Sequence, residues 1–309
     1  MLANFPPHFG ATFTKTLHSK PEGSTDPVTN RLPSNFVVVI TGAGKKLDDL
    51  PGQGYYTAIA YAKAGAHGIS ISSRTQSDLD KTKADILKIN PKVDVLSQVC
   101  DVTKDADVRK LAAEVKSHFG RVDAVVSSAG HTTDYIDKDT ENRRFPRGAV
   151  EDEGFDHIVA VNLIGSHNIA KHFIPLLAQT KDGVQSFVNI TSMASLLPTS
   201  QMTPLAFNIS KLAANRMVES MQADHGDEGI LAFSLHPGSA LTPGSRLHST
   251  TKVLSDDPAL CGGFCTWLTK ERREWLSGRY VSSNWDVDEL ASMKDDIVEH
   301  DKLKMRMVV

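Results

Sequence analysis

The sequence predicts an α/β protein with a single doubly wound parallel sheet of about seven strands and helices on both faces. Two observations lead to this prediction. Short apolar runs alternate with segments of about 10–15 residues that have helical periodicity. The first run, Phe36–Ile40, is apolar throughout, which is typical of a strand that is buried on both faces of a parallel sheet.

The strands are expected where β-branched and aromatic residues cluster between Gly, Asp, Asn or Ser. They lie at 36–40, 69–73, 93–100, 124–127, 186–190, 230–235 and 278–281. Helices are expected between them, because the intervening segments place apolar residues at helical spacing. They lie at about 55–65, 76–89, 105–118, 152–178 and 208–225. This alternation favours parallel strands joined by right-handed crossovers.

Residues 1–34 differ from the rest, because they are rich in Pro, Thr, Ser and Asn and lack periodicity. We expect an irregular arm there, lying on the body of the protein or on a partner subunit. Residues 35–309 then form one domain with a C-terminal tail. Its segment at about 239–258 is rich in Ser, Thr and Leu, and we expect it to be a substrate lid.

The composition narrows the class of protein. Hydrophobic residues make up 40% and charged residues 23% of the 309 residues, which is ordinary for a globular protein, and a net charge of −3 indicates no nucleic-acid partner. No apolar run reaches the ~18 residues that would span a membrane. The cysteines, Cys100, Cys261 and Cys265, form no CxxC pair, and the histidines show no metal-ligand spacing. We therefore expect a cytoplasmic protein with reduced thiols and no metal.

A series of short motifs runs along the chain: all but one directly follow a predicted strand, and Phe207-x-x-x-Lys211 comes 15 residues after Ser192. In order they are Thr41-Gly42-Ala43-Gly44, Ser73-Arg74, Asp101-Val102, Ser127-Ser128-Ala129-Gly130, Asn189-Ile190-Thr191-Ser192, Phe207-x-x-x-Lys211 and His236-Pro237-Gly238. As a series this resembles the short-chain dehydrogenase/reductase superfamily over about residues 36–285. The flanks Phe13–His18 and Gly278–Leu290 are similar to a fungal branch of it. The resemblance implies a Rossmann-like fold and a homodimer or homotetramer, commonly built on the helices at 152–178 and 208–225.

The resemblance also implies catalytic residues. Ser192 matches the serine that hydrogen-bonds the substrate oxygen, and Asn162 the asparagine that helps to hold a proton-relay water. Lys211 matches the lysine that binds the cofactor ribose and lowers the pKa of a neighbouring tyrosine. In this chain Phe207 replaces that tyrosine, and phenylalanine has no titratable group. A substitute donor could come from Tyr135 or His131, although such loop residues more often lie in solvent.

The cofactor residues implied by the resemblance follow the same strands. They are Gly42, Gly52, Gly54, Arg74, Asp101, Val102, Ala129, Gly130, Lys211, Pro237, Gly238 and Thr242. Nine residues separate Gly42 from Gly52, where the family has three, and the extra ones fall within Lys45–Pro51. Either this loop bulges outward and a dinucleotide still binds, or the phosphate grip is damaged. Arg74 favours NADP(H) if it is not simply solvated, and Asp101 either contacts adenine or caps a helix near Thr103.

Three functions remain open at this point. The favoured one is a non-redox conversion of a small carbonyl-containing secondary metabolite: a cyclisation, isomerisation, dehydration or pericyclic step that needs no phenol. The alternative is an NADP(H)-dependent carbonyl reductase or alcohol dehydrogenase with a substitute proton donor. The third is a protein that binds NADP(H) without catalysis. Both departures from the family pattern, at Phe207 and in the glycine loop, affect parts needed for hydride transfer, and this favours the first.

Overall fold

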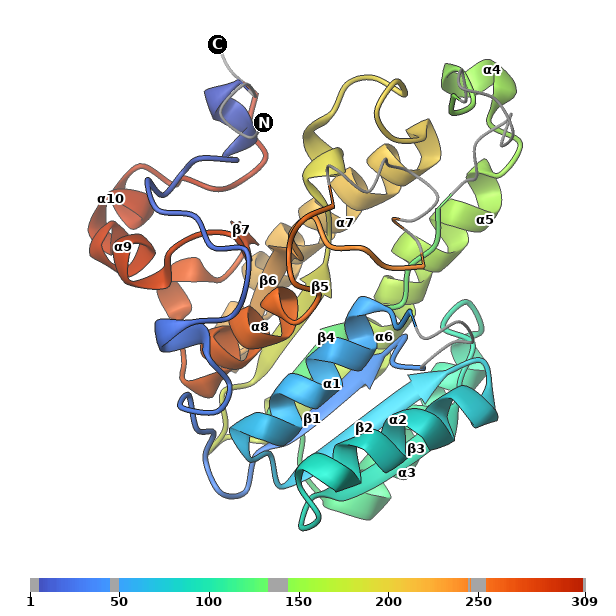
Figure 1. The fold of residues 1–309 in the computed structure, drawn as a ribbon, viewed down its shortest axis with the longest axis vertical. Coiled ribbons are helices and arrows are strands. Elements are labelled where there is room, and N and C mark those ends of the chain that lie inside the picture. The colour runs from blue at the N-terminus through green and yellow to red at the C-terminus, as the bar shows by residue number, and fades with distance from the viewer. Residues whose placement is uncertain (1–5, 45–49, 133–143, 244, 246–253, 308–309) are drawn as a thin grey trace.

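A computed structural model describes residues 6–44, 50–132, 144–243, 245 and 254–307. Its centre is a seven-stranded parallel sheet in the order β3-β2-β1-β4-β5-β6-β7 (Figure 1). This confirms the predicted fold class. The strands are β1 Val37–Thr41, β2 Gly68–Ser73, β3 Asp94–Val99, β4 Ala124–Ser127, β5 Ser186–Ile190, β6 Leu231–His236 and β7 Arg279–Ser282.

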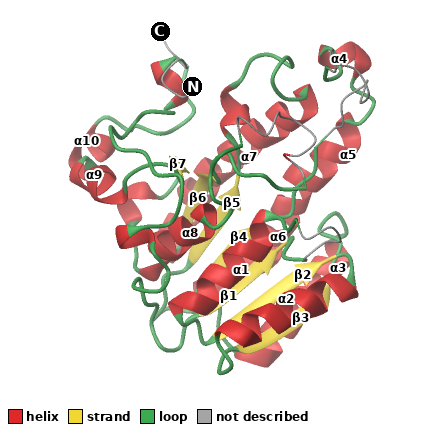
Figure 2. Ribbon diagram, viewed as in Figure 1, coloured by secondary structure: helices red, strands yellow, loops and turns green. Residues whose placement is uncertain are grey.

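Helices cover both faces of the sheet and produce two separate apolar cores (Figure 2). One core packs β1 residues such as Val38 and Ile40 against three helices: α1 Gln53–Ala64, α2 Gln76–Ile89 and α8 Leu260–Lys270. The other core lies on the opposite face, where Val39 and Val125 meet α3 Asp105–Phe119, α6 Gly165–Gln179 and α7 Leu205–His225. Successive strand residues face opposite cores, as the two-residue period of a strand requires.

The strand order places a topological switch point at β1. This strand pairs in parallel with β2 on one side and with β4 on the other, so the chain leaves its carboxyl end toward one half of the sheet and later returns to the other half. In sheets of this kind the crevice outside the carboxyl ends of the strands, next to the switch point, is where ligands bind. The motifs that follow carboxyl ends of strands lie along this edge, and Phe207-x-x-x-Lys211 is brought to it by helix α7, because Lys211 Nζ donates to the carbonyl of Ile190 at the end of β5.

Two parts of the predicted helix pattern differ from the structure. The helix expected at 152–178 is divided into α5 Phe155–Val159, a π-helical turn at Ala160–Ile164 and α6, and it is preceded by α4 Gly148–Glu151. Asp152 does not join a helix, because its carboxylate accepts the N–H of Ala206, 2.9 Å away, at the start of α7. The expectations also omitted α8, which is buried from Leu260 to Thr269 and contains Gly262-Gly263, two residues of low intrinsic helix propensity.

The N-terminal arm packs on the C-terminal part of the chain, whose helices are α9 Val287–Ser292 and α10 Lys294–Glu299 (Figure 1). Leu17 forms an isolated antiparallel bridge with Trp285, whose indole N–H donates to the carbonyl of Gly10 at 2.9 Å. The backbone N–H of Asp257, at the end of the lid segment, donates to Ser19 O at 2.7 Å. The arm therefore joins the tail to the base of the lid.

His18 lies at the centre of this arm contact. Its Nδ1 is 2.6 Å from Glu22 Oε1 and its Nε2 is 2.8 Å from Asp286 Oδ2. Burial alone would lower the pKa of His18, but the hydrogen bonds to Asp286 and Glu22 and their negative charges raise it above 6.5. The imidazolium is therefore the form that fits between the two carboxylates.

We predict that replacing this histidine changes stability in a pH-dependent way. Because the folded-state pKa is raised, the stabilisation is fully present below the unfolded value of 6.5 and is lost as the pH rises through the folded value. His18→Gln should therefore have a lower Tm than the wild type at about pH 6, and its free energy of unfolding should be lower by no more than about 1 kcal/mol, because the pair is partly exposed. Near pH 9 the two Tm values should approach each other. His167→Gln, which removes an exposed imidazole on α6, is the control. A Tm difference that grows as the pH rises would contradict this account.

Candidate functional site

The carboxyl ends of β1 and β4 are held together at the switch point. Thr41 Oγ1 accepts the backbone N–H groups of Ser128 and Ala129 at 3.1 and 3.2 Å. Gly42 has a φ of +67°, and a Cβ at this position would lie 2.8 Å from the backbone of Ala129. Only glycine therefore lets the two chains approach this closely.

The two glycines at the start of α1 have different surroundings. A Cβ on Gly54 would lie 2.5 Å from the carbonyl oxygen of Gly42, so this glycine is needed for the helix to pack on the sheet. Gly52 is the N-cap of α1, and a Cβ there would meet nothing within 4 Å. Gln53, between them, has a buried side-chain oxygen without a hydrogen-bond partner. Among the described residues nothing fills the position next to Gly52 at the helix N-terminus, where a phosphate would bind. Residues 45–49 of this loop lie outside the described residues.

Arg74 and the pair Asp101-Val102 end the two neighbouring strands. Arg74 is exposed, and its charge reaches the carboxylate of Asp101. Burial raises the pKa of Asp101, but hydrogen bonds from Thr103 and the charges of Lys104 and Arg74 outweigh this and lower it. Asp101 closes a turn by accepting from Thr103 N at 3.1 Å, whereas the N-cap of α3 is Lys104, so the interpretation of Asp101 as a helix cap is wrong.

Val102 is buried against α6. A Cβ on Gly165 would come within 2.6 Å of its side chain, and its carbonyl accepts from Asn168 Nδ2 at 2.9 Å. The side chain of Val102 thus packs against a helix, and its backbone helps to anchor the end of β3. Ala129 is half-buried and Gly130 is exposed at the end of β4.

Lys211 places its amine in the interior next to Phe207. Its Nζ donates to the carbonyl of Ile190 at 2.8 Å and lies 5.7 Å from the centroid of the Phe207 ring. The residue is only 5% exposed, and burial lowers the pKa of the amine to about 8. A Cβ built on Gly130 would lie 3.7 Å from this Nζ and 3.5 Å from Asn162 Oδ1, and apart from the chain neighbours of Gly130 no other described atom lies within 4 Å of it. The glycine therefore leaves the amine approachable from the crevice.

Both side-chain amide protons of Asn162 are donated to described residues. Its Nδ2 donates to His131 O at 2.9 Å and to Ser210 Oγ at 3.0 Å, while its Oδ1 accepts His131 N at 2.8 Å. The residue is fully buried in the π-helical turn. Asn162 therefore fixes the backbone that follows Gly130. Its carbonyl accepts from Ser166 Oγ, which in turn accepts from Ser127.

Ser192 stands at the end of β5 with its hydroxyl proton uncommitted to the described residues. Its Oγ accepts Ala194 N at 3.1 Å. The next peptide N–H, of Met193, donates to Nδ1 of His236 at 3.1 Å. Burial lowers the pKa of His236 to about 4, so the ring is neutral and can accept this bond. The motif series does not indicate the contact of His236 with the serine segment, because this contact depends on the pairing of β5 with β6.

The turn after β6 is anchored to Asp256, near the end of the segment 239–258. Gly238, which follows half-buried Pro237, has a φ of +85°, and a Cβ there would lie 2.9 Å from Asp256 Oδ2. The same oxygen accepts Ser239 N at 2.6 Å and Asn284 Nδ2 at 2.8 Å. Thr242 hydrogen-bonds Ser245 instead of facing a described site residue. Lid residues 244 and 246–253 lie outside the described residues.

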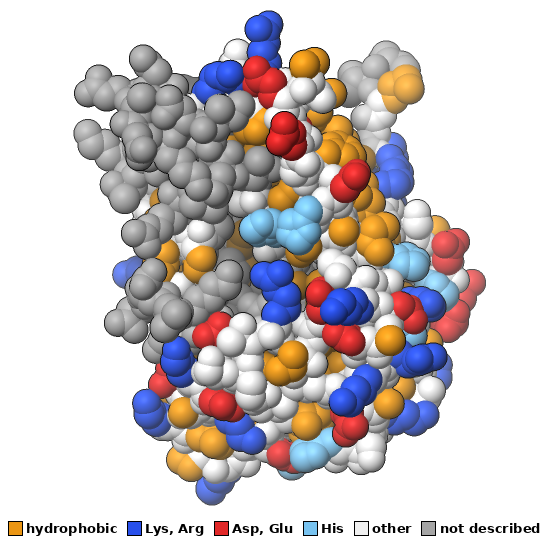
Figure 3. Space-filling view, turned by 90° about the vertical axis from the view of Figure 1, so that its right-hand side faces the viewer, with side chains coloured by type: hydrophobic (Ala, Val, Ile, Leu, Met, Phe, Trp, Pro, Cys, Tyr) orange, Lys and Arg blue, Asp and Glu red, His pale blue; other side chains and the backbone are white. Residues whose placement is uncertain are grey.

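Of the two substitute donors considered, only His131 can be placed. Tyr135 lies outside the described residues. His131 is exposed and meets His157 of α5 edge to face, with ring centroids 5.1 Å apart. Histidine side chains are visible near the middle of the face shown in Figure 3. Within the described residues, no three His, Cys, Asp or Glu side chains come together as a metal site.

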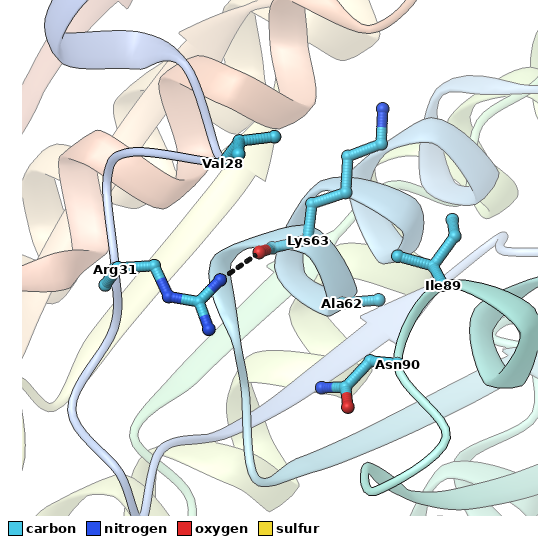
Figure 4. A pocket seen from close by; sticks show the side chains of 6 residues that line it. All are labelled: Val28, Arg31, Ala62, Lys63, Ile89 and Asn90. Carbon is cyan, nitrogen blue, oxygen red and sulfur yellow. Dashed lines mark hydrogen bonds between the residues drawn. The ribbon is translucent and has the colours of Figure 1, made fainter.

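A hollow on the surface lies away from the residues of the motif series. Figure 4 shows an open hollow of about 310 Å³, in which Arg31 Nη1 donates to Lys63 O at 2.7 Å. It is lined by Val28, Arg31, Ala62, Lys63, Ile89 and Asn90. These residues lie where α1 and α2 end, at the edge opposite the carboxyl ends of the strands, and contain no residue of the motif series. The described part of the chain contains no helix long and apolar enough to cross a bilayer.

Comparison with known sequences agrees with this arrangement. The profile of the short chain dehydrogenase family matches residues 36–252. The chain is 37% identical over 322 residues to "Short chain dehydrogenase pgmD" of Aspergillus terreus, covering 100% of this chain and 98% of that protein. It is 33% identical to "Short chain dehydrogenase mpl6" of Monascus purpureus, covering 99% of each.

Solved structures share the fold at lower identity. A 7 alpha-hydroxysteroid dehydrogenase in complex with NADH and 7-oxo glycochenodeoxycholic acid has a TM-score of 0.68 at 22% identity, covering 84% of this chain and 96% of that one. The RhlG/NADP active-site complex of Pseudomonas aeruginosa has a TM-score of 0.66 at 16% identity, covering 82% and 96%. At such identities the likeness concerns the fold alone.

We predict that the two glycines of α1 respond differently to alanine. Gly54→Ala should lower the free energy of unfolding by about 1–3 kcal/mol, because its Cβ would overlap the Gly42 carbonyl and backbone must shift. Gly52→Ala should change it by less than about 1 kcal/mol, since its φ of −83° suits alanine and the space is open. Urea unfolding of both variants measures this. Equal losses would show that the close contact at Gly54 does not decide the packing of α1.

Proposed function

The chain belongs to the short-chain dehydrogenase family, and we propose that it is an enzyme that converts a small carbonyl compound without net hydride transfer. The substrate class would be a carbonyl-containing secondary metabolite, and the step a cyclisation, isomerisation, dehydration or pericyclic rearrangement. The likeness to fungal relatives over their full length supports this setting. We further propose a cytoplasmic homodimer or homotetramer that acts on a small-molecule substrate.

One observation supports this proposal above the others. Phe207 lies beside Lys211, with 5.7 Å between its ring centroid and Nζ, so the ring is in place and its hydroxyl is missing. Phenylalanine cannot give a proton to a carbonyl oxygen as hydride arrives, nor take one from an alcohol. The rest of the pocket is intact around it: Ser192 has an uncommitted hydroxyl proton, and Lys211 has a buried amine.

The residues that remain are suited to holding a carbonyl and stabilising charge on it. Ser192 can donate its hydroxyl proton to a carbonyl oxygen, because its oxygen is oriented by the N–H of Ala194. His236 and Asn162 hold the backbone on either side of the pocket, at Met193 and His131 respectively. A rigid pocket of this kind accelerates a reaction by orientation and electrostatics without a cofactor step.

The residues present also fit a nicotinamide dinucleotide, and we propose that NADP(H) remains a ligand. The open position at Gly52, at the N-terminus of α1, would receive the pyrophosphate, and Gly130 would leave room for the nicotinamide ribose. Exposed Arg74, next to Asp101, would favour the 2′-phosphate. When bound, this group supplies hydride chemistry in the family. Here its role would be to shape the pocket.

The alternative is an NADP(H)-dependent carbonyl reductase or alcohol dehydrogenase. The retained positions of Ser192 and Lys211 favour it, because Ser192 with a water, or Tyr135, could replace the phenol as proton donor. The alternative requires such a substitute, whereas the non-redox function does not.

We predict that Arg74→Ala weakens the binding of NADPH about tenfold and leaves that of NADH unchanged. A charge-assisted hydrogen bond to the 2′-phosphate is worth about 1.5 kcal/mol or more, and NADH lacks this group. Titration followed by the fluorescence of the three tryptophans measures both affinities. Arg109→Ala, which removes an exposed cation on α3, is the control. Equal loss for the two nucleotides would rule out recognition of the 2′-phosphate by Arg74.

We predict that Phe207→Tyr creates a reductase activity that the wild type lacks. Restoring a general acid beside Lys211 should raise NADPH oxidation with a panel of ketones and aldehydes by about 10²- to 10⁴-fold. The absorbance of NADPH gives the rate for both proteins. Robust oxidation by the wild type would contradict the non-redox proposal and favour the alternative.

A further inference from the structure

We propose that Lys211 is a general base in this chain: its neutral amine takes a proton from the carbon next to the substrate carbonyl. This inference rests on the non-redox function proposed above and assigns the group that moves the proton. The substrates it implies are carbonyl compounds with an acidified α C–H bond, such as 1,3-dicarbonyl compounds.

The first support is the absence of a counter-charge. Lys211 makes one hydrogen bond, to the neutral carbonyl of Ile190, and no carboxylate among the described residues lies within ion-pair distance of its Nζ. Other buried cations of the chain are paired: Arg279 with Asp301 at 3.2 Å, and Arg273 with Glu271 at 2.8 Å. A lysine that is buried without a partner is poorly stabilised as an ammonium ion.

The second support is the approach to the amine. A Cβ built on Gly130 would lie 3.7 Å from Nζ and 3.5 Å from Asn162 Oδ1, and apart from the chain neighbours of Gly130 no other described atom lies within 4 Å of that position. Gly130 is itself exposed. A ligand atom can therefore reach the amine across this glycine, although Lys211 is only 5% exposed.

The third support is the residue next to the amine. A tyrosine at 207 would place an ionisable hydroxyl near Nζ, and a phenolate there would hold the lysine as its cation. The ring of Phe207 offers only a weaker attraction for a cation at 5.7 Å. Without the hydroxyl, residue 207 carries no titratable proton, and the amine of Lys211 has no ionisable partner at that position. With burial lowering its pKa to about 8, about a tenth of the molecules carry a neutral amine at pH 7.

The proposed step balances without a redox partner. The lone pair of Lys211 Nζ takes the α proton, the C–H electron pair forms the Cα=C bond, and the carbonyl π pair moves onto oxygen. Ser192 stabilises this enolate by donating a hydrogen bond. The ammonium then returns the proton either to another atom of the same skeleton, which completes an isomerisation, or to a β-hydroxyl, which leaves as water.

The charge and the accessibility of the amine can be measured without a known substrate. Trace acetylation with acetic anhydride over a range of pH, read residue by residue by mass spectrometry, gives the titration midpoint of every reactive lysine in one sample. We expect Lys211 to titrate at about pH 8, and its midpoint to rise in Phe207→Tyr. An ordinary midpoint at Lys211, or no labelling at any pH, would overturn the proposal.

Arginine separates a base from a cationic anchor. Lys211→Arg keeps a cation and hydrogen-bond donors but cannot be deprotonated near neutral pH, and Lys211→Met removes both functions. In a source strain that lacks the gene, we expect neither variant to restore the product seen by mass spectrometry, whereas Lys63→Arg restores it fully. Restoration by Lys211→Arg would contradict the base.

These outcomes are independent of the test of the function itself. A wild type without NADPH oxidation whose Lys211 titrates as an ordinary lysine would refute the base and leave the non-redox function in place. Robust NADPH oxidation would refute the function whatever the labelling gives.

Discussion

Parallel pairing of β1 with β4, and of β4 with β5, is the constraint on which the pocket depends. Because these strands run in the same direction, their carboxyl ends meet at one edge, and Gly42, Gly130 and Ser192 come together from distant parts of the chain. The contact of Gly42 with Ala129 and the hydroxyl of Thr41 fix how closely β1 and β4 approach. Helix α7 places Lys211 at the same edge, where its Nζ donates to the carbonyl of Ile190.

The charge states of Lys211 and His236 depend on how the loss of water compares with the gain of charged partners. Inside the pocket, Lys211 loses water and gains one neutral acceptor, so the charged form loses more than it recovers. His236 shows the same effect on the other side of Ser192: burial keeps its ring neutral, which allows it to accept the N–H of Met193. Two buried nitrogen groups thus lie at the end of β5: His236 accepts the N–H of Met193, and Lys211 donates to the carbonyl of Ile190. Phe207 maintains the apolar surroundings without adding a competing proton.

Much of the fold could be predicted from the sequence, because strands buried on both faces appear as apolar runs and the motifs mark their ends. The strands at 124–127 and 186–190 were predicted to the residue. Helix α8 was missed because Gly262-Gly263 lower its intrinsic helix propensity, and packing against the body of the protein stabilises it instead. In the site, the meeting of Ser192, Lys211 and Phe207 at one edge followed from motif order. The commitment of Asn162 to the His131 backbone could not be predicted, since it depends on side-chain contacts across 31 positions.

The oxidation level of the product tests the central claim most directly. An extract from a source strain that lacks the gene would be incubated with the purified protein and with NADPH deuterated at the transferred position. The account predicts a product with the composition of its precursor, or smaller by one water, and without deuterium from the cofactor. A product that contains one transferred deuterium and one added proton would contradict it, because hydride transfer would then be the reaction this pocket performs.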